Sequence, residues 1–250
     1  MKAITHSTPT NGAYYRNLLS NRPHPLKSLD SIATIMTCHR GQEICREAQP
    51  AEHWYFVISG VVRRCVLRPD GRRQIVGLLL PGDFFGFTAG DEYDYTAEAI
   101  AEGTVLASYP RRRVEALADS DPSLARELRQ VTFEAMSRLQ AQLLILGRIT
   151  ALEKVGSFIL EMEIRLSHGG GDSIALPVSR YDIADYLAIS VETVSRSLTD
   201  LKHRGVIKLS GTRTVKIVDR DVLEDGEHNE WSGRPKVQAH GTVTPVRAAA

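Results

Sequence analysis

The hydrophobic pattern near the C-terminal end of the chain, within residues 179–204, predicts two short helices separated by a tight break. Ser179 can cap the first helix, and Asp182 completes an S-x-x-D capping box. Ser190 can cap the second helix. The apolar faces of these helices repeat at helical spacing and consist of Ile183, Ala184 and Leu187 in the first and Val191, Val194, Leu198 and Leu201 in the second. Because the small Ala184 allows the helices to approach closely, the pair is predicted to be a helix-turn-helix.

An alternating segment follows this pair of helices. Gly205 is a helix stop, and Val206–Val218 then alternates between apolar and polar residues around the turn signal Ser210-Gly211. Alternation around such a turn predicts a β-hairpin. In this position, a hairpin is expected to form a wing beside the helix-turn-helix.

Short apolar runs separated by turn signals such as Pro69-Asp70-Gly71 extend from Thr34 to about Tyr109. The runs are Trp54–Ile58, Val61–Leu67, Gln74–Leu80, Phe84–Phe87 and Tyr95–Tyr109. Strands of this length and spacing indicate a β-sandwich or jelly roll.

A long helix is predicted from Pro122, since no further Pro or Gly occurs before Gly147. At 1.5 Å per residue it would be roughly 40 Å long. Its apolar steps of three and four residues suit a two-stranded coiled coil, whereas a helix packed on its own β-domain is the alternative. A helix-turn-helix favours the dimer, because two recognition helices must reach major grooves about 34 Å apart. The predicted dimer-interface residues are Leu124, Leu128, Val131, Ala135, Leu139, Leu143 and Leu146.

The outward face of the second helix of the pair carries side chains that can read base pairs. Arg196 can donate two hydrogen bonds to guanine, and Glu192 can accept one from the N4 amine of cytosine. They are four residues apart and project side by side, so the alternative is an ordinary surface ion pair. From Arg196 to Lys216, six basic residues and one acidic residue give a local charge of +5, while the chain has a formal net charge of +1. A localised basic face is typical of proteins that contact DNA phosphates.

The segment Val191–Arg196 resembles the E-x-x-S-R recognition helix of the CRP/FNR superfamily, specifically its FNR and FixK branches. The resemblance covers roughly Thr34 to Leu223 and implies a homodimeric bacterial transcription regulator with RNA polymerase as a partner. It also implies that Glu192, Ser195 and Arg196 contact the bases of a TTGA-type half-site in an inverted repeat. The expected contacts to the DNA backbone are Ser179, Arg180, Thr193, Thr199, Lys202 and Arg213. One departure is Ala188, which stands at a turn position where many helix-turn-helices have Gly.

The fold class expected from the pattern and the resemblance together is α+β. It comprises an N-terminal β-roll of the double-stranded jelly-roll type, a long dimerisation helix and a C-terminal winged helix-turn-helix. The expected boundaries are an irregular arm over 1–25, the β-roll over 26–118, the dimerisation helix over 119–147, the DNA-binding domain over 148–225 and a disordered tail over 226–250. A flexible joint is expected at His168–Gly171, after a second helix over Ala151–Ser167.

No cyclic nucleotide is expected in the β-roll. Relatives that bind one carry a Glu for the ribose and an Arg-Ser pair for the phosphate. This chain has Phe87 at the Glu position and Tyr95-Thr96 at the Arg-Ser position, so the phosphate would lack its bidentate partner.

No resident metal or cluster is expected either. The cysteines are Cys38, Cys45 and Cys65, too few for the roughly four thiolates of an iron–sulfur cluster. Cys38-His39 with Cys45 matches no strong metal-binding pattern, and a lone His53 is weak evidence for a haem ligand. The favoured alternative for the cysteines is that they are small buried hydrophobes.

Two classes of function remain: a sequence-specific transcription regulator, and a cupin-type metal protein with an appended helix-turn-helix. Cupins need a close His-x-His pair, and none occurs among His6, His24, His39, His53, His168, His203, His228 and His240. No nucleophile–base constellation indicates an enzyme. The N-terminus lacks an apolar signal region and no run reaches membrane-spanning length, so a cytoplasmic protein without a membrane partner is expected.

The FixK-like resemblance favours an activator of microaerobic or anaerobic genes that needs no effector. An effector-gated regulator, with haem or metal in an apolar pocket lined by Phe84, Phe85 and Phe87, is the alternative.

Overall fold

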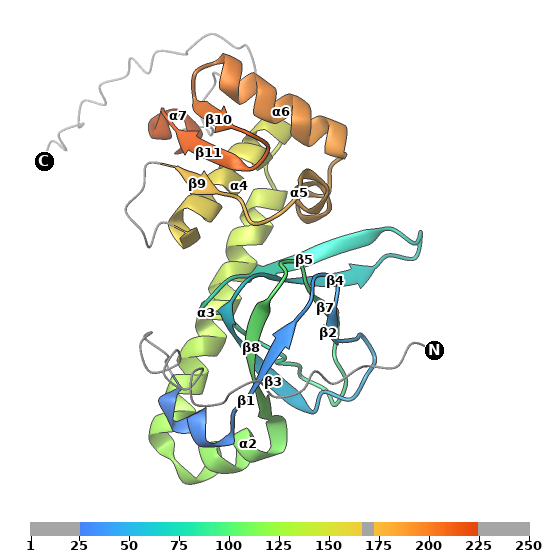
Figure 1. Ribbon diagram of the computed structural model, residues 1–250, viewed down its shortest axis with the longest axis vertical. Coiled ribbons are helices and arrows are strands. Elements are labelled where there is room, and N and C mark those ends of the chain that lie inside the picture. Colours follow the sequence, from blue (N-terminus) through green and yellow to red (C-terminus); the bar gives the residue numbers. More distant parts are fainter. Residues whose placement is uncertain (1–25, 167–172, 225–250) are drawn as a thin grey trace, which may run out of the picture.

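The structure is a computed structural model that describes residues 26–166 and 173–224 (Figure 1). A β-domain, a long helix α3 (Pro122–Leu146) and a helical C-terminal domain with a small sheet follow one another along the chain. The arm predicted over 1–25, the joint predicted at His168–Gly171 and the tail predicted over 226–250 lie outside the described residues.

The β-domain consists of two four-stranded antiparallel sheets, with strand orders β1-β8-β3-β6 and β2-β7-β4-β5. The strands are β1 (Thr34–Cys38), β2 (Glu43–Cys45), β3 (His53–Ser59), β4 (Val62–Leu67), β5 (Arg73–Leu79), β6 (Phe84–Phe85), β7 (Thr96–Ala99) and β8 (Thr104–Pro110). The predicted run Tyr95–Tyr109 is therefore two strands, separated by a turn in which Gly103 has a φ of 69°. The two layered sheets confirm the β-roll, and a short 3-10 helix, η1 (Lys27–Ile32), precedes them.

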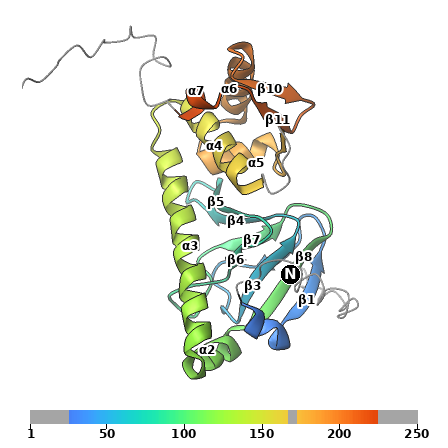
Figure 2. The ribbon, with the colours of Figure 1, turned by 90° about the vertical axis from the view of Figure 1, so that its left-hand side faces the viewer.

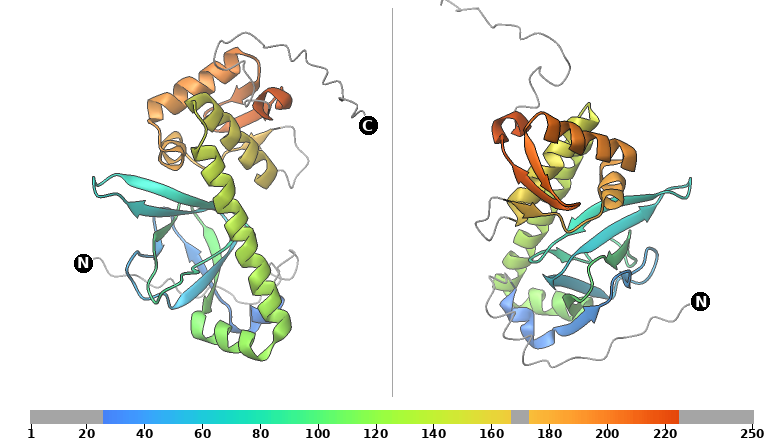
Figure 3. Two further views of the ribbon diagram at one scale, coloured as in Figure 1. Left: turned by 180° about the vertical axis from the view of Figure 1, so that it is seen from behind. Right: turned by 45° about the horizontal axis from the view of Figure 1, so that its top comes forward.

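Helix α3 follows α2 (Arg111–Ser120) and runs along one side of the β-domain (Figure 2). The Asp121 side chain caps it by accepting a hydrogen bond from the Ser123 amide, and Pro122 occupies its first turn. One face of α3 packs on the β-domain, where Leu124 and Val131 are almost completely buried. Seen from behind, the opposite face of the helix is not covered by any other described element (Figure 3).

The C-terminal domain is a winged helix-turn-helix. Its elements are α4 (Ala151–Leu166), β9 (Ile174–Ala175), α5 (Arg180–Leu187), α6 (Val191–His203), β10 (Ile207–Ser210), β11 (Thr214–Ile217) and α7 (Arg220–Glu224). Both predicted caps are present, because Ser179 and Asp182 form a reciprocal capping box and Ser190 accepts from the Thr193 amide. The predicted wing is the antiparallel pair β10 and β11, to which β9 adds a third strand.

The turn between α5 and α6 is left-handed at Ala188, which has a φ of 55°. A residue with a Cβ pays roughly 1–2 kcal/mol in this conformation. The amide of Ala188 donates to the Ala184 carbonyl, and the neighbouring amide of Ile189 donates to the same carbonyl at 3.1 Å. The departure from Gly in the sequence therefore leaves the helix-turn-helix turn intact.

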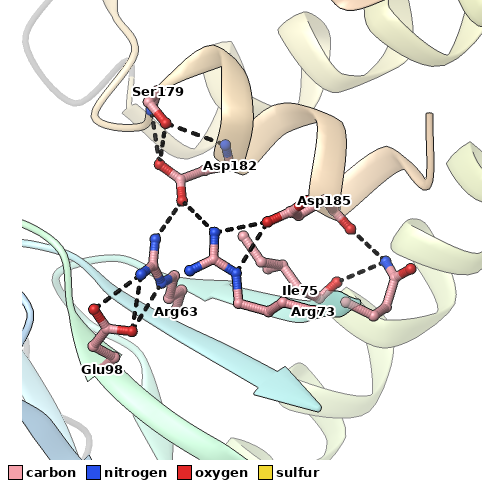
Figure 4. Close-up of polar contacts among 8 residues, drawn as sticks. Arg63, Arg73, Ile75, Glu98, Ser179, Asp182 and Asp185 are labelled. Atoms are coloured by element: carbon pink, nitrogen blue, oxygen red, sulfur yellow. Dashed lines mark hydrogen bonds and ion pairs between the residues drawn. The ribbon is translucent and has the colours of Figure 1, made fainter. Parts of the chain in front are cut away.

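The hairpin formed by β4 and β5 docks against α5 through ion pairs and hydrogen bonds (Figure 4). Arg63 on β4 donates to Asp182 on α5 at 2.5 Å and to Glu98 on β7 at 2.9 Å. Arg73 on β5 donates to the carboxylate of Asp185 at 2.7 Å. Because Asp182 is also the capping-box residue of α5, one carboxylate both starts the helix and attaches it to the β-roll.

The electrostatics of Asp182 favour this attachment. Burial of the carboxylate raises its pKa, but hydrogen bonds from Ser179 and the positive charge of Arg63 outweigh that effect and hold the pKa below its usual value. The side chain of Asp182 is only 8% exposed and that of Arg63 only 13%. Solvent therefore screens this pair less than the exposed ion pairs of the chain.

Apolar packing joins the same two domains. Cys65, Ile75 and Leu78 of the β-roll belong to one hydrophobic cluster with winged-helix residues such as Ile183 and Leu187. Polar contacts surround this cluster, since Gln142 on α3 donates to the Ile75 carbonyl and Arg165 on α4 pairs with Asp83. The β-roll and the winged helix thus share a core, which fixes the position of α5.

Replacing Asp182 with Asn is expected to lower the free energy of unfolding at pH 7 by about 1–3 kcal/mol. A carboxylate with a lowered pKa contributes stability above the pKa of the unfolded chain, about 3.9, and loses it as the pH falls through the lower folded pKa. The wild-type stability should therefore decline below about pH 4, and the decline should be smaller in the variant. Urea unfolding at several pH values measures both effects.

The matched control is Asp200→Asn, which removes an exposed i,i+4 pair with Arg204. Such a pair is worth only about 0.3–0.5 kcal/mol. Equal losses in the two variants would show that the contact between Arg63 and Asp182 does not stabilise the domain interface.

Candidate DNA-binding surface

Helix α6 lies at the end of the molecule farthest from α2, with α5 between it and the β4–β5 hairpin (Figure 1). Its inner face is anchored by the fully buried side chains Val194, Leu198 and Leu201. Because these recur at three- and four-residue steps, the intervening polar side chains project outward. The N-terminal half of that outer face holds the predicted base-reading residues.

Glu192 and Arg196 lie side by side on this face, as their spacing predicted. The Arg196 Nη2 donates to Glu192 Oε1 at 2.5 Å, and the two side chains are 69% and 79% exposed for Glu192 and Arg196 respectively. An exposed pair at this spacing is worth about 0.3–0.5 kcal/mol, so exchanging it for contacts to a base costs little.

Ser195 lies where the two helices meet. Its hydroxyl accepts a hydrogen bond from Arg180 Nη1 on α5 at 3.1 Å, and its carbonyl accepts one from Thr199 at 2.9 Å. Ser195 is half-buried, in contrast to its neighbour Arg196. Arg180, which the sequence assigned to the DNA backbone, therefore also links α5 to the recognition helix.

Some of the side chains predicted to contact the DNA backbone are exposed, whereas others already form hydrogen bonds within the protein. Lys202 and Arg213 are exposed. The hydroxyl of Ser179 donates to Asp182 within the capping box, and that of Thr193 is 2.7 Å from the Ser190 hydroxyl at the start of α6. Tyr181 on α5, which the sequence interpretation missed, is 69% exposed.

The residues predicted to form the dimer interface differ in how far they are buried within their own chain. Leu124 and Val131 belong to the core of their own β-domain, and Leu128 packs partly buried against the same cluster. Ala135 and Leu146 are half-buried, while Leu139 and Leu143 are exposed. The prediction therefore combined two faces of one helix. The exposed face also carries Phe133, Met136 and Leu144, which the prediction omitted.

The inner face of α3 has a polar continuation toward the winged helix. After Ala135 that face continues through Arg138 and Gln142, which pack toward the β-roll as partners of Asp83 and of the Ile75 carbonyl. A search for apolar residues skips these two positions and crosses to Leu139 and Leu143. Heptad-spaced Met136 and Leu143 were the signal in the sequence for the exposed face.

Aromatic side chains occupy the β-roll positions at which cyclic-nucleotide-binding relatives carry polar groups. Phe87 packs edge-on against Trp54 at 4.9 Å between ring centroids, and the Tyr95 hydroxyl accepts a hydrogen bond from the Gly86 amide. The Arg64 guanidinium lies 5.0 Å from the centre of the Tyr95 ring, a cation–π distance. Neither Phe87 nor Tyr95 can replace the carboxylate and the guanidinium that hold a cyclic nucleotide in such relatives.

The cysteines are all buried thiols. Burial raises the pKa of Cys38 to about 11, of Cys45 to about 12 and of Cys65 to about 11. At neutral pH they are therefore protonated, and a thiol is a poor metal ligand and nucleophile compared with a thiolate. Within residues 26–166 and 173–224, His, Cys, Asp and Glu form no group of three or more that is suited to a metal ion. In the same ranges no helix combines the length and apolarity needed to cross a bilayer.

Two family models match the chain. The cyclic nucleotide-binding domain model covers residues 35–121, and the Crp-like helix-turn-helix domain model covers residues 153–225. The first match covers the β-domain and α2, and the second covers the winged helix.

The chain is also similar to proteins with assigned roles. It is 40% identical to the nitrogen fixation regulation protein FixK of Azorhizobium caulinodans, over 89% of this chain and 92% of that protein. It is 39% identical to FixK of Rhizobium meliloti, over 80% of this chain and 89% of that protein. The solved structure of FixK2 from Bradyrhizobium japonicum superposes with a TM-score of 0.72 at 40% identity, covering 78% of this chain and 96% of that one.

Regulators of this family bind DNA and act as dimers. The identity, the two matched domains and the exposed recognition helix agree, and the chain belongs to the CRP/FNR superfamily of DNA-binding transcription regulators, in its FixK-like branch.

Proposed function

We propose that this regulator binds, as a homodimer, an inverted repeat with TTGA-type half-sites and activates transcription of microaerobic or anaerobic genes. The proposal rests mainly on the exposed pair of Glu192 and Arg196 on the outer face of α6. Arg196 would read the guanine of the half-site through O6 and N7, while Glu192 would accept from the N4 amine of the paired cytosine. Ser195, between them along the helix, would make the third base contact.

The backbone contacts would fix the register of α6 in the groove. Lys202 and Arg213 are exposed and cationic, so they would pair with phosphates directly. Arg180, Thr193 and Thr199 surround the base-reading residues and would contact phosphates at the edges of the groove. Ser179 would have to exchange its bond to Asp182, which makes it the weakest member of the proposed set.

The dimer would form along the exposed apolar face of α3. This face consists of Phe133, Met136, Leu139, Leu143 and Leu144, each between 41% and 72% exposed. Large apolar side chains gathered on one uncovered helix face typically mark an interaction site. A second copy of α3 would cover them and place two recognition helices on the two half-sites.

Binding would require no small-molecule effector. The carboxylate and guanidinium that hold a cyclic nucleotide are replaced by Phe87 and Tyr95, and Arg64 stacks on Tyr95. Phe84 and Phe85, proposed walls of a haem pocket, are nearly fully buried and pack on Phe56 and Tyr55. These contacts favour the effector-independent regulator over the haem-gated alternative. RNA polymerase would be the partner on the promoter.

Arg196→Ala is expected to weaken binding to the repeat by about 1–3 kcal/mol and to relax discrimination at one guanine, because a bidentate base contact is lost. Titration against duplexes in which that base pair is varied measures both effects. The comparison is Lys202→Ala, which should weaken binding to repeat and random duplexes alike and lower the salt dependence. If Arg196→Ala behaves as Lys202→Ala does, Arg196 contacts only the backbone.

The double variant Leu139→Glu with Leu143→Glu is expected to be monomeric, because its carboxylates would be buried in the interface between two α3 helices. Sedimentation measures the state of association, and binding to the inverted repeat should fall with it. Leu117→Glu, at a 36% exposed apolar position on α2, is the matched control and should stay dimeric. If the double variant remained dimeric, the dimer interface would not lie on the exposed face of α3.

Protein purified without haem or added metal is expected to bind the inverted repeat in air at nanomolar concentration, with no change on adding a cyclic nucleotide. Fluorescence anisotropy with a labelled duplex measures the affinity. Rescue of an inactive preparation by haem, by a cyclic nucleotide or by strict anaerobiosis would instead support an effector-gated regulator.

A further inference from the structure

A groove of about 670 Å³ separates the tip of the β4–β5 hairpin from the turn of the helix-turn-helix. On the β-roll side it is lined by Arg68, Arg72, Arg73 and Gln74. On the other side it is lined by Tyr181 and Asp185 of α5, by the turn residues Ala188 and Ile189, and by Ser190 and Val191 at the start of α6. The groove therefore joins a domain without a proposed DNA contact to the end of the recognition helix.

The hairpin tip is held firmly beside that turn. Gln74 donates to the Asp185 carbonyl and Arg73 pairs with the Asp185 carboxylate, so both contacts attach the hairpin to α5 (Figure 4). Within the tip, the Arg68 amide donates to the Arg72 carbonyl at 2.9 Å, which closes the loop. The backbone at Arg68 and Arg72 is thus attached to α5 through the neighbouring residues Arg73 and Gln74.

The charges of the tip favour an anionic partner. Arg68 is exposed and donates to the neutral side chain of Gln74, so no carboxylate neutralises it in this contact. Arg72 is 78% exposed and pairs with Asp70, which is itself in contact with solvent. Solvent screens this exposed pair, and a phosphate can replace the carboxylate at little cost. Arg73, by contrast, is already engaged with Asp185.

The position of the groove beside the helix-turn-helix favours DNA phosphate as the anionic partner. In a helix-turn-helix, the N-terminal residues of the second helix enter the major groove while the first helix crosses the DNA backbone. Ser190, Val191 and the exposed Tyr181 line the groove, and in a complex of this geometry they would lie at that crossing. A DNA strand that passes Tyr181 and Ser190 would run along the side of the groove opposite Arg68 and Arg72.

We propose that the β4–β5 hairpin is a second DNA-binding element, in which Arg68 and Arg72 contact phosphates beside the half-site read by α6. This inference rests on the proposed orientation of α6 toward DNA and extends the protein–DNA surface from the winged helix to the β-roll. The partner is the phosphate backbone, so the contacts add affinity without sequence preference.

The test is the double variant Arg68→Gln with Arg72→Gln in the full-length protein. Binding is titrated at several salt concentrations against an inverted-repeat duplex extended by about one helical turn, roughly 10 base pairs, on each side, and against a random duplex of equal length. Two arginines in each of two protomers make four contacts, so the slope of log affinity against log salt should fall by up to about 3.6. Affinity for both duplexes should decrease by the same factor.

The matched control is Arg112→Gln with Arg113→Gln. These two exposed arginines lie on α2 at the opposite end of the molecule, and the variant has the same change in net charge. It should keep the wild-type slope. The conservative double variant Arg68→Lys with Arg72→Lys should largely keep the wild-type slope, since Lys also pairs with phosphate.

Three results would overturn the proposal. A double variant with the slope and affinity of the control would show that the tip does not touch DNA. Loss confined to the inverted repeat, with an unchanged slope, would show that the arginines only position the winged helix. Unchanged DNA binding with reduced transcription in a reconstituted system would assign the tip to RNA polymerase. Failure of the wild-type protein to prefer the repeat would instead contradict the proposed function, and the random duplex would still test the hairpin.

Discussion

The carboxylate of Asp182 connects the two halves of this molecule. Within α5 it completes the capping box with Ser179, and across the domain interface it accepts from Arg63, whose guanidinium also binds Glu98. A buried guanidinium is unfavourable unless its donors are satisfied by anions in good geometry. Arg63 reaches this state only when α5 lies against the β4–β5 hairpin. The ion pair therefore specifies one placement of the helix-turn-helix relative to the β-roll, and the shared apolar cluster around Ile75 stabilises that placement.

Helix α3 has to satisfy two packing requirements at once. Its inner face buries Leu124 and Val131 on the β-roll, and its outer face leaves Phe133 and Leu143 exposed. The inner face is therefore packed within the single chain, whereas the outer face stays exposed in it. The polar residues Arg138 and Gln142 continue the inner face toward the winged helix, where they bind groups of the β-roll rather than solvent.

Local features of the fold were predictable from the sequence because their causes lie within a few residues. The capping box of Ser179 and Asp182, Pro122 at the start of α3 and the hairpin around Gly211 each depend on neighbouring residues. The juxtaposition of Glu192 and Arg196 follows from helical spacing alone. By contrast, the contact between Arg63 and Asp182 joins residues 119 positions apart, and no local pattern marks it. The two faces of α3 were confused because periodicity identifies apolar stripes without showing what covers each one. Tyr181 was missed because a single exposed aromatic residue on a helix has no periodic signature.

The core shared between the β-roll and the winged helix has a consequence for how such proteins can be recombined. The two family models end at residue 121 and begin at residue 153, which suggests two modules joined by a helix. Yet Cys65, Ile75 and Leu78 belong to the same apolar cluster as Leu187 and Val194. A chimera that exchanged only the winged helix would set this chain's β4–β5 hairpin against another protein's α5, and Arg63 and Arg73 would keep their partners only if that α5 carried carboxylates at the positions of Asp182 and Asp185. In this chain the structural unit that positions the recognition helix is therefore larger than the DNA-binding domain, because it includes the strands β4 and β5 against which that domain packs.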